Sequence, residues 1–128
     1  MTGSADDARP PVWVGHVSLR VGDVSKSTGF FEALGMRRIF ESGEVGVLEL
    51  RAGTHLVLLP SGDPIPSDAT APFDLMVDDI DVARERYARL GLELSPLERG
   101  RIHDSFTLLD PNGYRITVNS SHASGKPV

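Results

Sequence analysis

The side chains in this chain that could carry out chemistry are few and well separated. His16, His55 and Asp74 could each act as a general base, because burial in a dry cavity readily tunes imidazole and carboxyl groups for proton transfer near neutral pH. The run His-Asp-Ser at 103–105 has the residue types of a hydrolytic triad, but adjacent residues on a strand point to opposite faces and cannot converge. Cysteine is absent, which excludes a thiolate metal site and a cysteine nucleophile.

The composition narrows the class of function. The chain has 128 residues, enough for one modest core that two half-size units could share. A net charge of −5 without a basic run argues against a nucleic-acid surface. No apolar stretch approaches the roughly 20 residues of a membrane span, and residues 1–11 lack the pattern of a secretion signal. We therefore expect no nucleic-acid or membrane partner and a cytoplasmic location.

Hydrophobic patterning predicts the elements that position the candidate side chains. In the first half, alternation indicates half-buried strands, and a Gly stop signal ends the one helix between them. The same order returns after a linker, 61–72, that is rich in proline. The expected first unit, 12–60, has strands at 12–21, 37–41, 45–50 and 55–59 and a helix from Asp23 or Ser25 to Leu34. The expected second unit, 73–121, has strands at 73–77, 93–97, 105–109 and 114–119 and a helix capped by Asp81 and ending at Leu90. Residues 1–11 and 122–128 are expected to be flexible ends.

An internal repeat supports this division. A shift of 56 residues superimposes eight chemically similar positions in one register, and a shift of 60 aligns the last strands of the two units. The matched pairs include Leu19 with Leu75, Asp23 with Asp79, Phe31 with Tyr87, Gly35 with Gly91 and Leu58 with Val118. The chain is therefore predicted to be one duplicated unit.

The order and spacing of these features resemble one known family. They comprise two βαβββ units, a first strand that opens at His16, a helix that ends Leu34-Gly35-Met36, and a turn Asp-Pro-Asn-Gly at 110–113. Over roughly residues 12–121 this set resembles the vicinal oxygen chelate superfamily (the glyoxalase, bleomycin resistance protein and dioxygenase family). Within that superfamily, the chain most resembles the antibiotic-binding resistance proteins. The resemblance implies an α+β fold in which two tandem units form a curved mixed sheet that encloses a cup, with the helices on the outer face. It also implies a homodimer, with each cup formed within one chain or between two.

Strand parity indicates which side chains would line this cup. Val17, Leu19 and Val21 need a helix to cover them, so the alternate residues of the first strand point into the cup. The same parity applies to the later strands, and aromatic or methionine side chains add flat or soft apolar contact. The expected ligand-binding residues are His16, Ser18, Arg20, Phe40, His55, Val57, Asp74, Met76, Phe106, Arg115, Thr117 and Asn119.

The resemblance also implies where a metal ion would bind. The four ligand positions of metal-dependent members fall here on His16, Val57, Pro72 and Thr117. Val57 and Pro72 have no donor atom for a metal, and a Thr hydroxyl is a poor ligand for a divalent ion. We therefore expect no cofactor, and a divalent metal only if His16, His55 and His103 form an alternative set.

Charges inside a cup need partners, and either Arg20 or Arg115 is the expected partner of Asp74. Trp13 is expected to pack in the core or in a subunit interface rather than on a ligand. The favoured function is metal-free binding, or sequestration, of a small, partly aromatic molecule such as an antibiotic or secondary metabolite. The alternative is a lyase, isomerase or dioxygenase of the glyoxalase type that uses a metal or a general base, His16 or His55. A third class is a regulatory or structural dimer with an empty cup.

Overall fold

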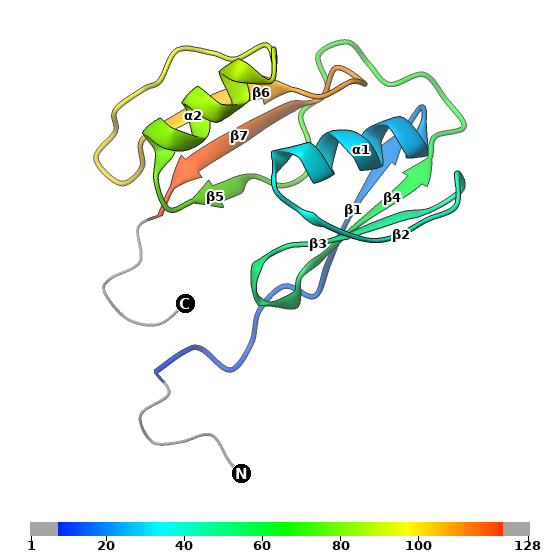
Figure 1. Ribbon diagram of the computed structural model, residues 1–128, viewed down its shortest axis with the longest axis horizontal. Coiled ribbons are helices and arrows are strands. Elements are labelled where there is room, and N and C mark those ends of the chain that lie inside the picture. The colour runs from blue at the N-terminus through cyan, green and yellow to red at the C-terminus, as the bar shows by residue number, and fades with distance from the viewer. Residues whose placement is uncertain (1–7, 122–128) are drawn as a thin grey trace.

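The computed structural model describes residues 8–121, which form two similar units side by side, each with a helix against a small sheet (Figure 1). Unit 1 contains β1 (His16–Val21), α1 (Val24–Leu34), β2 (Arg37–Glu41), β3 (Gly46–Glu49), a 3₁₀ turn (Arg51–Gly53) and β4 (His55–Pro60). Unit 2 contains β5 (Leu75–Val77), α2 (Ile80–Arg89), β6 (Ser105–Leu109) and β7 (Arg115–Ser120). The predicted α+β fold of two tandem units with mixed sheets is confirmed.

The two sheets share one connection pattern. Their strand orders are β1-β4-β3-β2 and β5-β7-β6, and neither sheet closes into a barrel. In each unit the first and last strands pair in parallel (β1 with β4, β5 with β7), and the other pairs are antiparallel. Two parallel strands must be joined by a long crossover connection. In unit 1 this connection starts with α1, and in unit 2 it starts with α2.

Both helices start and stop at matched positions of the repeat. Asp23 accepts a hydrogen bond from the Lys26 backbone N–H at 3.0 Å, and Asp79 accepts one from the Val82 N–H at 3.1 Å. The prediction that Asp81 caps the second helix is wrong: Asp81 already lies in the first turn, and the carboxylate that reaches the free N–H belongs to Asp79. A glycine with positive φ follows each helix, Gly35 at 122° and Gly91 at 80°.

The core lies between each helix and the sheet face that it covers. Leu56 and Leu58 of β4 and Ile116 and Val118 of β7 are fully buried, together with Phe31 of α1. The alternate residues of the same strands are exposed or half-buried, as the predicted parity requires.

Two predicted strands differ in the structure. The first begins only at His16, and Trp13 before it is 65% exposed, so it does not pack in the core of its own chain. Residues 93–97 form no strand. Leu94 makes an isolated bridge with Leu108, and a second bridge, Glu98 with Ser105, lies just beyond the predicted strand. Pro96 has no N–H to donate, and the Ser95 carbonyl accepts hydrogen bonds from the Arg84 guanidinium instead of from a strand.

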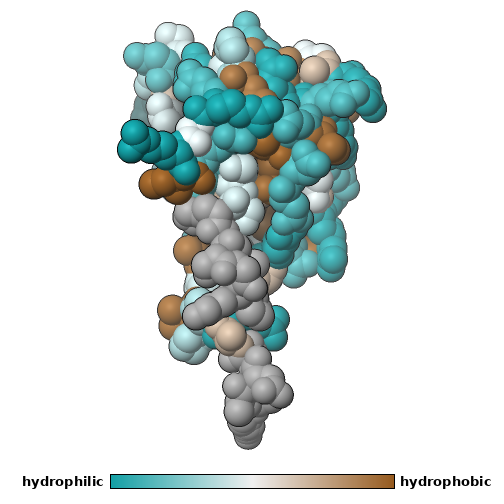
Figure 2. Space-filling view, turned by 90° about the vertical axis from the view of Figure 1, so that its left-hand side faces the viewer, coloured by the Kyte–Doolittle hydropathy of each residue, from teal (hydrophilic) through white to brown (hydrophobic). Residues whose placement is uncertain are grey.

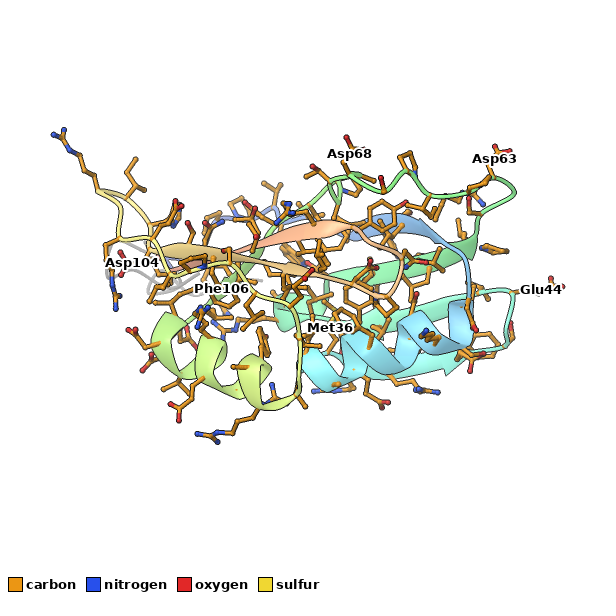
Figure 3. All side chains as sticks on the ribbon, turned by 90° about the horizontal axis from the view of Figure 1, so that it is seen from above. Met36, Glu44, Asp63, Asp68, Asp104 and Phe106 are labelled. Atoms are coloured by element: carbon orange, nitrogen blue, oxygen red, sulfur yellow. The ribbon has the colours of Figure 1, made fainter. Side chains whose placement is uncertain are left out.

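The turn at 110–113 and the end of α2 hold the two units together. The Asn112 side chain accepts a hydrogen bond from the Gly22 N–H at 2.9 Å and donates to Ser27 Oγ at 3.2 Å. Tyr87 Oη donates to the Leu34 carbonyl at 3.0 Å. Met36 lies between the two helices at this junction (Figure 3).

The remaining segments complete the outline of the molecule. Residues 61–72 contain no helix or strand apart from a bridge between Thr70 and Arg115. Viewed from the side of unit 2, the surface is mainly hydrophilic and carries small, separate hydrophobic patches (Figure 2). None of the helices within 8–121 is long and apolar enough to cross a membrane. The ends that we expect to be flexible, 1–11 and 122–128, fall mostly outside the described residues.

Candidate ligand-binding site

The cup face of unit 1 is the sheet face opposite α1, and one row across it is polar. Backbone pairing aligns His16 with His55, His55 with Glu49, and Glu49 with Arg37. The two imidazole rings stack, with centroids 5.6 Å apart and planes at 26°. His55 Nε2 lies 3.9 Å from Glu49 Oε2, and Arg37 Nη1 lies 3.0 Å from Glu49 Oε1. This polar row therefore connects two imidazoles, a carboxylate and a guanidinium.

The next row along the cup face of unit 1 is largely apolar. Ser18 is aligned with Val57, Val57 with Val47, and Val47 with Phe40. Phe40, which is 52% exposed, reaches this face because the register of β2 shifts just before it. Such a β-bulge reverses the facing of the residues that follow. This apolar row offers a ligand a flat aliphatic and aromatic surface beside the polar row.

The cup face of unit 2 carries a different set of groups. Asn119 Nδ2 donates a hydrogen bond to Asp74 Oδ2 at 3.0 Å, and Arg115 Nη1 donates one to Thr107 Oγ1 at 3.0 Å. Met76 is aligned with Asn119 and is 51% exposed. Thr117, aligned with Thr107, lies between these groups on β7. Unit 2 therefore contributes amide, hydroxyl, carboxylate and guanidinium groups rather than imidazoles.

One predicted ligand-binding residue does not face the cup. Phe106 is only 2% exposed and lies between β6 and α2, where its ring contacts that of Tyr87 at a centroid distance of 6.2 Å (Figure 3). It is aligned with the buried Val118, so it belongs to the helix-covered face. The residues of β6 on the other face are Ser105, Thr107 and Leu109.

The predicted ion pair of Asp74 with an arginine is also wrong. The Arg20 guanidinium donates to the Pro60 carbonyl at 3.2 Å, and that of Arg115 donates to Thr107. Each guanidinium thus has an acceptor on a strand of its own unit, and Asp74 takes its hydrogen bond from Asn119 instead.

A cavity of about 680 Å³ lies where the two units meet. Its walls come from the end of α1, the start of β2, the end of β3, the whole of β5 and one residue of α2. Of the predicted site residues, Asp74 and Met76 line it. At its edge the Arg51 guanidinium donates two hydrogen bonds to the Asp78 carboxylate, at 3.1 and 2.7 Å. These bonds and the charge of Arg51 lower the pKa of Asp78 below its usual range.

Comparison with known proteins identifies the family. The model of the Glyoxalase/Bleomycin resistance protein/Dioxygenase superfamily matches residues 13–118. The chain belongs to this superfamily. The resemblance predicted from its motifs is confirmed. Among curated proteins, no sequence matches the chain significantly.

Solved structures of the superfamily share the fold at low sequence identity. Lactoylglutathione lyase from Agrobacterium tumefaciens is 18% identical, with a TM-score of 0.72 and coverage of 91% of this chain and 99% of that one. TnmS3, an antibiotic-binding protein from Streptomyces sp. CB03234, is 22% identical, with a TM-score of 0.74 and coverage of 85% and 95%. The fosfomycin resistance protein FosX from Listeria monocytogenes is 22% identical, with a TM-score of 0.70 and coverage of 85% and 90%. At these identities the likeness shows the fold alone.

The donor groups of this superfamily member do not fit a divalent metal ion. Within residues 8–121, no three His, Asp or Glu side chains converge as a metal site requires. Val57 lies beside Ser18, one row away from His16, and the residue beside His16 is His55. His103 is in unit 2, with Nδ1 2.8 Å from the Ser120 carbonyl oxygen, so the alternative histidine set is not assembled.

Sequence reasoning missed two members of the polar row, Glu49 and Arg37. Their charges are visible in the sequence, but their place beside His55 depends on the pairing of β3 with β4 and of β2 with β3. A one-residue slip in either pairing would move them to the opposite face. Only the structure shows that His55 has a carboxylate neighbour.

Proposed function

We propose that this protein binds a small, partly aromatic molecule on its cup faces and needs no metal ion to do so. The observation that supports this most is the apolar row of Ser18, Val57, Val47 and Phe40 beside the stacked imidazoles of His16 and His55. Flat apolar surface beside a few fixed polar groups is the common composition of drug-sized ligand sites. The antibiotic-binding relative with this fold makes an antibiotic or secondary metabolite the ligand class to test first.

A second copy of the chain would complete the site. Phe40 and Met76, on the cup faces of units 1 and 2, are each about half exposed, and Trp13 beside β1 is more so. Exposed aromatic and methionine side chains of this kind are enriched in subunit interfaces. In the proposed homodimer, the cup face of unit 1 of one protomer meets the cup face of unit 2 of its partner, which encloses a ligand between them.

Thermal-shift screening tests the binding function. The full chain is melted with aromatic antibiotics and related metabolites, in EDTA and in the presence of divalent ions. We expect at least one aromatic compound to raise Tm in EDTA, since a ligand at 100 times its Kd stabilises the folded state by about 2.7 kcal/mol. Stabilisation by a divalent ion alone, or by compounds only when the ion is present, would contradict metal-free binding.

A pair of matched variants localises the site. Val57→Asp puts a charge in the apolar row, whereas Val82→Asp puts the same charge on the outer surface of α2, where Val82 is 59% exposed. We expect Val57→Asp to abolish the ligand-induced rise in Tm and Val82→Asp to retain it. Equal effects of the two variants would place the ligand elsewhere.

A second candidate function is general-base catalysis by an isomerase or lyase. It is favoured by the position of His55, whose Nε2 lies 3.9 Å from the Glu49 carboxylate. An imidazole close to a carboxylate is a common arrangement in enzymes that use general-base catalysis. Mass spectrometry of ligands recovered after incubation distinguishes the two functions: a product that His55→Gln no longer makes indicates an enzyme, and unchanged ligand indicates a binding protein.

A further inference from the structure

We propose that the cavity between the two units binds a small organic cation, a protonated amine on a flat apolar body, with the Asp74 carboxylate as its counter-ion. This inference rests on the proposed function, because it specifies the charge of the small molecule that the protein is proposed to bind. It also adds a place, since the cavity continues from the cup face of unit 2 to the junction with unit 1.

The cavity has the size and apolar character for such a body. Its volume of about 680 Å³ is within the range of roughly 300–1,000 Å³ that is usual for small-molecule sites. Met36 and Met76 line it, and methionine adapts its shape to flat ligands. Leu34, Leu50, Leu75 and Val77 complete the apolar part of the wall.

The charges around the cavity favour a cation. Arg37 and Arg51 are the cations of the lining, and each already has a carboxylate partner, Glu49 at 3.0 Å and Asp78 at 2.7 Å. The charge of each guanidinium is therefore already balanced by a neighbouring carboxylate. The third carboxylate of the lining is Asp74, which leaves the wall with one negative charge in excess.

Asp74 is placed to receive a charged N–H donor. Within the described part of the chain, no Arg, Lys or His forms an ion pair with Asp74. Its Oδ2 accepts a hydrogen bond from Asn119 Nδ2, which fixes the orientation of the carboxylate. An ammonium group at Asp74 would make a charge-assisted hydrogen bond, the stronger kind, while its apolar body enters the cavity.

The test compares two ring-matched probes on the full chain. The first is 9-aminoacridine, which is cationic at neutral pH, and the second is acridine, which is largely neutral there. Fluorescence titration at low salt is expected to give 9-aminoacridine an affinity about tenfold higher, as expected for one hydrogen bond to a charged group. Raising the salt concentration should reduce this advantage, because salt screens the ion pair.

Two variants with the same change in net charge locate the effect. Asp74→Asn is expected to lower the affinity for 9-aminoacridine to about that for acridine. Asp68→Asn is the control, because Asp68 lies on the linker, points outward and is not part of the cavity wall (Figure 3). The advantage should persist in this variant. If Asp74→Asn does not fold, Asn119→Ala, which removes the hydrogen bond that orients the Asp74 carboxylate, takes its place and should also reduce the advantage.

Four outcomes would overturn the proposal. Equal affinities for the two probes would overturn it while leaving the proposed function intact, since acridine would still bind. Equal effects of Asp74→Asn and Asp68→Asn would show that only net charge matters. A change of oligomeric state in Asp74→Asn, measured by light scattering, would show that the cavity is a contact between copies. Binding of neither probe, together with no stabilising compound in the screen, would contradict the proposed function as well.

Discussion

Units 1 and 2 repeat one structural pattern, but their residues are similar only on the sheet face that the helix covers. On the helix-covered face the matched residues agree in character: Leu56 with Ile116, and Leu58 with Val118, all fully buried. On the cup face the matched residues differ: His55 with Arg115, and Val57 with Thr117. Burial restricts the first face to apolar side chains of a suitable size, whereas the open face has no such restriction. The two units therefore share a scaffold, and in the proposed binding site they would contribute different halves.

The largest expected effect concerns the shared scaffold. Phe31 and Tyr87 occupy matched positions, and both are almost completely buried. Replacing either with Ala should lower the free energy of unfolding by about 3–5 kcal/mol, because each leaves a large cavity. Urea denaturation measures both losses, with Val82→Ala on the exposed side of α2 as the control. A loss below about 1 kcal/mol at one position would show that the two helix faces are not equivalent.

A smaller effect is expected at a turn whose backbone hydrogen bonds unit 1 repeats but whose side-chain acceptor it lacks. Asp110 is 6% exposed, and its carboxylate accepts hydrogen bonds from the Asn112 and Tyr114 backbone N–H groups at 2.9 and 2.8 Å. The matched residue in unit 1 is Leu50, which has no such acceptor. Asp110→Ala should lower the free energy of unfolding by about 2–3 kcal/mol, since the donors lose a charged acceptor. An unchanged urea midpoint would show that the turn holds without its carboxylate.

The two helix caps should be equal and weaker still. Asp23→Ala and Asp79→Ala each remove one hydrogen bond to a free backbone N–H of a helix start. Each should lower the free energy of unfolding by about 1 kcal/mol. Asp68→Ala on the linker is the control, because it removes an exposed carboxylate that caps no helix (Figure 3). If Asp68→Ala proves as harmful as Asp23→Ala and Asp79→Ala, the losses come from the change in net charge and not from the caps.

The smallest effect is a pH dependence that comes from Tyr87. Burial raises the pKa of its phenol above the usual value. The folded chain then keeps this proton at a pH where the unfolded chain releases it, so the free energy of unfolding falls as pH rises above about 10. Tyr87→Phe should make this fall shallower, although burial also raises the pKa of Tyr114. Urea midpoints measured between about pH 8 and 11 test this, and an equally steep fall in both proteins would contradict it.

Sequence patterns predicted the scaffold well because burial leaves a periodic trace. The alternation around Leu56 and Leu58 placed His55 and Val57 on the cup face, where the structure has them. Phe106 was misplaced because its aromatic ring suggested ligand contact, whereas the alternation of β6 groups it with the buried Leu108, on the face that is covered. The strand at 93–97 was overpredicted because Pro96 was given too little weight.

Side-chain partners were harder to predict than faces. Arginines were expected beside Asp74, but long side chains reach several acceptors, and the nearer ones are Pro60 and Thr107. The amide of Asn119 takes their place. Such choices depend on distances of a few ångströms between strands, which a single sequence does not contain.

Equilibrium dialysis in EDTA, with a compound that the thermal-shift screen selects, tests the central claim most directly. Metal-free sequestration predicts that the compound accumulates on the protein side, that EDTA leaves its affinity unchanged, and that it is recovered chemically intact. Loss of binding in EDTA, or recovery of a converted product, would contradict this account and indicate an enzyme.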